Sequence, residues 1–83
     1  MKWITKAKHI KNFEIKVTFN DKKTAIIDFA SLLTGEIFEP LKDQSYFIKF
    51  SIHPDLEVIT SPNGADFSPD YLYEIAENQS KAS

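Results

Sequence analysis

The sequence predicts an α+β domain: a small, mostly antiparallel sheet of about five strands that packs against a C-terminal helix, with one or two short helical turns. Three observations predict this fold. Residues 13–19 alternate strictly between apolar and polar side chains, as a half-buried strand does. Several other β-prone segments are separated by polar turns. Near the C-terminus, Ser68-Pro69-Asp70 is a typical helix start, and apolar residues follow it at helical spacing.

The N-terminal third is predicted to form three strands. Residues 3–10 form the first, with Lys6 and Lys8 on the solvent face. In residues 13–19 the apolar positions point to the core, and the polar positions between them point to solvent. Residues 20–23 are polar and favour a turn, so residues 24–28 return as the second arm of a hairpin.

The middle of the chain carries weaker signals. Residues 29–33 fit one helical turn, of α or 3₁₀ type, which Asp28 caps and Thr34-Gly35 ends. Residues 36–41 are expected to be extended as far as Pro40, and residues 42–46 form a polar connection with room for one further helical turn.

Two further strands are predicted after this connection. Residues 47–52 are apolar on much of both faces, which predicts a central strand. Residues 53–56 then form a turn, and residues 57–61 form the last strand.

The segment from Ser61 to Asp70 contains several residues that favour a specific backbone conformation. Gly64 is expected at positive φ, and Ser68 is expected to cap a helix that runs to about Asn78. The helix should turn Leu72, Ile75 and Ala76 toward the sheet and leave Tyr73 outward. We therefore expect a single domain over residues 1–78 and a flexible tail over residues 79–83.

The composition disfavours most kinds of catalytic site. The 83 residues include no cysteine, only two glycines and only two histidines, His9 and His53. Disulfides and thiolate sites are excluded, and neither a zinc motif nor a phosphate-binding loop is present. Asp28, Asp66 and Asp70 could form a carboxylate cluster, but turn and helix capping explains them better. We expect a domain that is not an enzyme and has no metal or cofactor.

No targeting segment or membrane span is visible, because lysines interrupt the N-terminal residues and no apolar run is long enough. A small domain without disulfides is more often intracellular than secreted, so a cytoplasmic location is expected.

The charge is distributed unevenly along the chain. Residues 1–23 hold seven lysines against two acidic residues, a net charge of +5, and residues 24–83 hold three lysines against ten acidic residues, a net charge of −7. This asymmetry fits a polarised surface for a partner. The simpler interpretation is that lysines coat strand edges and solvent faces. The absence of arginine disfavours sequence-specific reading of nucleic acid.

Several residues together resemble the bacterial domain-of-unknown-function family numbered 2442. They are Trp3, the strand end Phe19-Asn20-Asp21, the segment from Asp28 to Leu33, Pro40-Leu41, Phe47 and above all the block from Pro62 to Tyr73. The resemblance implies a small α+β fold without an established activity; some members are joined to a helix-turn-helix segment, and others have been proposed as antitoxin-like partners. This chain departs from the pattern at Ser61, where tryptophan is frequent, and in the first hairpin, where glycine is frequent.

The expected function is protein–protein interaction, and the resemblance makes a small toxin-like protein the first partner to consider. The candidate interaction surface is Trp3, Tyr71, Tyr73, Glu74 and Glu77. The candidate structural motif is Pro62, Asn63, Gly64, Ala65, Asp66, Ser68 and Pro69. Nucleic-acid binding or autoregulation by the lysine-rich N-terminal strands is the alternative. Exposed sheet edges leave a homodimer open.

Overall fold

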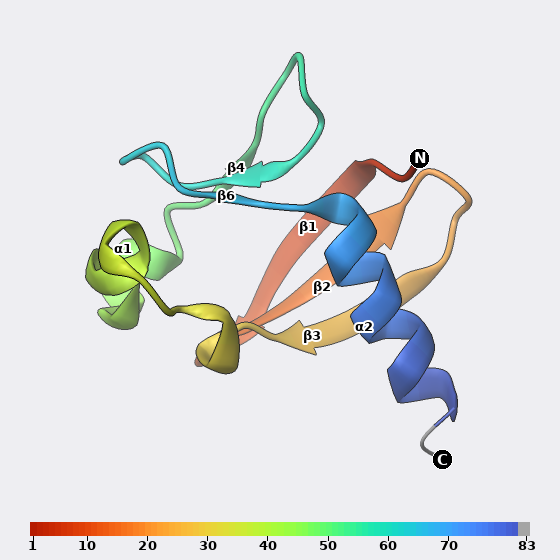
Figure 1. Cartoon of the computed structure of the whole chain (residues 1–83), viewed down its shortest axis with the longest axis horizontal. Coiled ribbons are helices and arrows are strands. Elements are labelled where there is room, and N and C mark those ends of the chain that lie inside the picture. The colour runs from red at the N-terminus through yellow and green to blue at the C-terminus, as the bar shows by residue number, and fades with distance from the viewer. Residues whose placement is uncertain (82–83) are drawn as a thin grey trace.

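The computed structural model describes residues 1–81 and contains two three-stranded sheets rather than the one five-stranded sheet predicted (Figure 1). Both sheets are antiparallel and have their strands in sequence order. The first consists of β1 (Ile4–Lys11), β2 (Glu14–Phe19) and β3 (Thr24–Asp28). The second consists of β4 (Ser51–Ile52), β5 (Ile59–Thr60) and β6 (Asp66–Phe67).

The first sheet confirms the strands predicted from alternation. Ile15, Val17 and Phe19 are buried, and the residues between them face away from the core. Across the β2–β3 pair, Ile15 lies opposite Ile27, which is also buried. One face of this sheet is therefore apolar and packed, and the other is open to solvent.

A short 3₁₀ helix, η1 (Ala30–Leu32), follows β3 as predicted. The Asp28 carboxylate accepts the backbone N–H of Ala30 at 2.9 Å, so Asp28 caps this turn. Phe29 and Leu33, on either side of η1, are buried in the core.

Residues 36–41 are helical where extended chain was predicted, and a helical turn forms at residues 44–47, where the predicted connection left room for one. A second 3₁₀ helix, η2 (Glu36–Lys42), includes Pro40, and α1 (Gln44–Phe47) follows it. Phe38 and Leu41 are three residues apart and both pack inward, which suits the three-residue repeat of a 3₁₀ helix. Asp43 caps α1, since its carboxylate accepts the N–H of Ser45 at 3.0 Å.

The predicted central strand over residues 47–52 is wrong for most of its length. Phe47 is buried at the end of α1, and strand pairing is confined to Ser51–Ile52. A short apolar run does not distinguish a strand from a buried helical segment. The last predicted strand, residues 57–61, pairs only at Ile59–Thr60, and β6 forms where a loop was predicted.

The two sheets and the helical segment share one core, which phenylalanine rings connect. Phe47 contacts the rings of Phe13 (centroids 5.2 Å apart) and Phe29 (5.9 Å). Phe29 meets Phe67 edge to face at 4.8 Å, and Phe67 meets Phe38 at 5.2 Å. These rings come from the turn between β1 and β2, from the residue after β3, from η2 and α1, and from the second sheet, so they make a single packing unit.

The C-terminal helix α2 (Pro69–Lys81) lies across the first sheet, next to β3 (Figure 1). The Ser68 hydroxyl accepts the N–H of Tyr71 at 3.3 Å, so the predicted cap is confirmed. Leu72 and Ala76 are fully buried and Ile75 partly. The helix continues past Asn78, so three residues of the expected tail are helical and the other two, 82–83, lie outside the described residues. Within residues 1–81, no helix has the length and apolar character needed to cross a bilayer.

Candidate interaction surface

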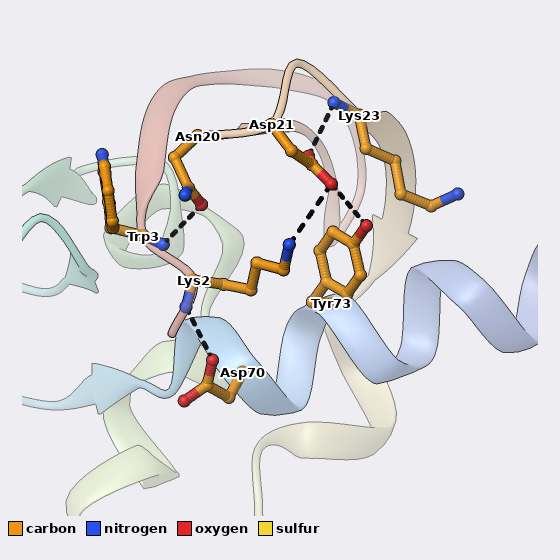
Figure 2. A network of polar contacts seen from close by, with 7 residues as sticks. All are labelled: Lys2, Trp3, Asn20, Asp21, Lys23, Asp70 and Tyr73. Carbon is orange, nitrogen blue, oxygen red and sulfur yellow. Dashed lines mark hydrogen bonds and ion pairs between the residues drawn. The ribbon is translucent and has the colours of Figure 1, made fainter.

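Tyr73 is part of a polar network rather than an outward-facing anchor (Figure 2). Its hydroxyl donates a hydrogen bond to the Asp21 carboxylate at 2.5 Å, and its ring packs edge to face on Phe19 with centroids 5.0 Å apart. The prediction that Tyr73 points outward is therefore wrong. Helical spacing alone predicted an outward ring, and only the fold reveals the hairpin turn that Tyr73 meets.

Lys2 closes the same network from the N-terminal side. Its amine lies 3.4 Å from the Asp21 carboxylate and 4.3 Å from the centroid of the Tyr73 ring. Its backbone N–H donates to the Asp70 carboxylate at 2.8 Å. The network thus fastens the start of the chain and the β2–β3 turn to the first turns of α2 (Figure 2).

The electrostatics of the pair hold both groups in fixed protonation states near neutral pH. The hydrogen bond from the Tyr73 hydroxyl, followed by that from the Lys23 N–H, lowers the pKa of Asp21 to about 2. The same bond to Asp21 raises the pKa of Tyr73 to about 12. Asp21 is therefore ionised and Tyr73 protonated at pH 7, and neither group changes its protonation state near neutral pH.

Trp3 is partly exposed and directly precedes β1. Its backbone N–H donates to the Asn20 side-chain oxygen at 3.0 Å, and its indole points away from the Tyr73 ring (Figure 2). Glu74 and Glu77 are exposed on α2. Of the predicted surface residues, Trp3 and Tyr73 therefore direct their rings to different sides (Figure 2).

Tyr71 is the aromatic side chain of α2 that faces solvent, with 54% of its surface exposed. It borders a recess of about 250 Å³ formed where η1, η2, β6 and the start of α2 meet. Besides Tyr71, the recess is lined by Ser31, Leu32, Thr34, Phe38, Asp66, Phe67 and Ser68. Sequence reasoning identified Tyr71 but missed Phe38, because residues 36–41 were predicted to be extended. It also missed Leu32, because the helical turn of η1 was predicted but not its position beside α2.

The block from Pro62 to Pro69 builds a turn and the start of α2. Gly64 has φ of +89°, as predicted, and its N–H donates to the Ser61 carbonyl at 2.9 Å. The Asn63 side chain accepts the N–H of Ala65 at 3.1 Å and donates to the Ile37 carbonyl at 2.9 Å. Asn63 thereby shapes the turn and ties it to η2, a long-range role that its turn propensity does not reveal.

The three candidate aspartates have separate positions. Asp28 caps η1, Asp70 holds the backbone of Lys2, and Asp66 lies on β6 at the recess. Among residues 1–81, no three histidine, cysteine, aspartate or glutamate side chains gather in a way that could hold a metal ion.

A second and larger concavity lies on the solvent face of the first sheet. It measures about 810 Å³ and is lined by Lys6, Ala7, Lys8, Lys16, Thr18, Thr24 and Ile52. We refer to it as the lysine groove. Its three lysines come from β1 and β2, and in the part of the chain that the structure describes none of them forms an ion pair. Alternation predicted the solvent face, but not that Ile52 of β4 would border it.

Comparison with known proteins adds one finding. The model of the family described as "Protein of unknown function (DUF2442)" matches residues 4–78, nearly the whole chain. No curated protein and no solved structure matches.

Proposed function

The chain belongs to the family of proteins of unknown function DUF2442, and we propose that this member is a non-catalytic module that binds a protein partner through Tyr71 and the recess beside it. The observation that carries the proposal is the exposed Tyr71 ring next to a recess with Leu32, Phe38 and Phe67 in its wall. Tyrosine is enriched at protein interfaces because it offers apolar area together with a polar tip.

The rim of the recess supports directional contacts as well as apolar ones. Ser31, Thr34 and Asp66 bring two hydroxyls and a carboxylate to its edge. Glu74 is exposed one turn after Tyr71 on α2, so the two side chains share a face of the helix. This arrangement suits an anchor side chain of the partner that enters the recess while polar groups pair around it.

The non-catalytic part of the proposal is supported by how the titratable groups are used. The two groups whose pKa values move furthest, Asp21 and Tyr73, are bonded to each other and stabilise the fold. A general acid or base instead has a pKa near the working pH, and its titrating atom can reach the substrate.

We propose a small toxin-like protein encoded beside this chain in a bacterial genome as the first partner to test, acting in the cytoplasm. Co-expression of the two proteins followed by size-exclusion chromatography should give one co-migrating peak. Tyr71→Ala should abolish co-migration, because it removes the anchor, while leaving α2 intact since alanine is the best helix former.

Ile48→Ala is the matched control, because Ile48 is also about half exposed (49%) but lies after α1 rather than on the recess. It should leave co-migration unchanged. Co-migration that survives Tyr71→Ala would show that the partner binds elsewhere.

A further inference from the structure

We propose that the lysine groove is a second docking surface, independent of the Tyr71 recess, and that its occupant is a short acidic segment of a partner protein. The groove lies on the open face of the first sheet, whereas the recess lies between η1, η2, β6 and α2. The two surfaces can therefore be tested separately.

The first argument is uncompensated positive charge. Lys8 of β1 lies directly opposite Lys16 of β2 in the strand register, and Lys6 is two residues from Lys8 on the same face. Like charges directly opposite each other across strands destabilise a sheet. No carboxylate lies directly opposite Lys6, Lys8 or Lys16 on a neighbouring strand. An anionic ligand would therefore relieve the repulsion.

The second argument is that the positive stretch is short. On β2, Glu14 alternates onto the same face as Lys16, and Glu14 is paired with Asp28 of β3. Lys11 of β1 lies opposite Glu14, so the row beyond Lys16 holds two carboxylates and one amine, and the uncompensated positive stretch ends there. The three strands themselves span only about 10 Å. A few residues of a peptide fit this length, whereas a continuous phosphate backbone would pass over the carboxylates.

The third argument concerns the chemistry of the lining. The groove combines amines with the hydroxyls of Thr18 and Thr24, and with apolar contributions from Ala7 and Ile52. Its lining contains no aromatic ring on which a base could stack, and the chain has no arginine to read base edges. A segment with both carboxylate and aliphatic side chains complements this lining better than nucleic acid does.

The proposal is tested with the full chain by fluorescence anisotropy. The probes are a labelled tetrapeptide of alternating glutamate and valine, its glutamine–valine counterpart, and a labelled DNA duplex. The glutamate peptide should bind at low salt, and its affinity should fall as salt rises because the contacts are exposed charges. The glutamine peptide should bind at least about tenfold more weakly, which corresponds to about 1.4 kcal/mol.

Two double variants locate the site. Lys8→Gln with Lys16→Gln should weaken binding of the glutamate peptide about tenfold or more. Lys42→Gln with Lys49→Gln removes the same charge outside the groove and should change affinity less than about twofold. Melting curves should show both variants folded, since removing Lys8 and Lys16 relieves a repulsion. Tyr71→Ala should leave peptide binding unchanged.

Three results would overturn the proposal. One is absence of glutamate-peptide binding to the unmodified chain. Another is an equal loss of affinity in the two double variants. The third is tighter binding of the DNA duplex with the same dependence on Lys8 and Lys16, which would make the groove a nucleic-acid surface.

Discussion

The Tyr73 hydroxyl and the Asp21 carboxylate, 52 residues apart in sequence, are joined by a 2.5 Å hydrogen bond that links α2 to the turn between β2 and β3. Lys2 adds its amine to the same carboxylate. A residue that sequence reasoning assigned to an interface therefore holds the fold together, and its neighbour Tyr71 is the one left to solvent.

This pair predicts how stability depends on pH. Asp21 has a pKa lowered from 3.8 to about 2 in the folded state, so its stabilisation is present above pH 4 and is lost as pH falls through 2. Tyr73 has a pKa raised from 10.0 to about 12, so its stabilisation is present below pH 10 and is lost as pH rises through 12. Tyr73→Phe should lower the melting temperature between these limits, and the difference from the unmodified chain should shrink outside them.

Tyr71→Phe is the control for this experiment, because Tyr71 is exposed and lies two residues away on the same helix. It should follow the pH profile of the unmodified chain. A constant difference between Tyr73→Phe and the unmodified chain over the whole pH range would contradict the assignment.

Phe47→Ala tests the aromatic core. Phe47 is fully buried and contacts the rings of Phe13 and Phe29, so its truncation should lower the free energy of unfolding by about 3–5 kcal/mol. Ile48→Ala, at the exposed neighbouring residue, should cost less than about 0.5 kcal/mol. Urea denaturation measures both. Equal losses would mean that residues 47–48 are placed incorrectly.

Gly64→Val tests the turn before α2. Nothing lies within 4 Å of a β-carbon built at Gly64, so the cost comes from its φ of +89° rather than from a clash. A β-branched residue resists that conformation, and the free energy of unfolding should fall by more than about 1 kcal/mol. Gly64→Asn should cost less, since asparagine tolerates positive φ. Unchanged stability in Gly64→Val would show that the turn is built differently.

Ser61→Ala should stabilise the protein. The Ser61 hydroxyl is buried and has no hydrogen-bond partner among the described residues, which is unfavourable. Removing it should raise the free energy of unfolding by about 1 kcal/mol in urea denaturation. Ser45→Ala should have the opposite effect, because the Ser45 hydroxyl donates to Asp43 at 2.7 Å. Loss of stability in Ser61→Ala would mean that its hydroxyl is bonded.

Local sequence patterns predicted the elements whose structure depends mainly on residues close by in the sequence. Alternation from residue 13 onward identified β2, and the serine cap with Pro69 identified the start of α2. The second sheet was not predictable in the same way. Its strands have two residues each, which is too few for any periodicity. β4 and β6 form because each can pair its backbone with β5 in the folded chain.

The candidate site likewise has a part that local sequence predicts and a part that depends on long-range contacts. The position of Tyr71 on a helix face follows from sequence, but the recess beside it depends on Phe38 and Leu32, which come from separate 3₁₀ helices. The role of Asn63 depends on the Ile37 carbonyl, 26 residues away. Contacts of this range are products of the complete fold, and no local pattern encodes them.

The hydrogen bond from Lys2 to Asp70 spans 68 residues, far more than the turns that join neighbouring strands within each sheet. Closing so large a loop costs more chain entropy than forming a hairpin, and the contact fastens a chain end, so we expect it to form late in folding and to open readily in the native state. Amide exchange at Lys2 should accordingly be much faster than at Val17, and removing a few residues from the beginning of the chain should loosen the beginning of α2.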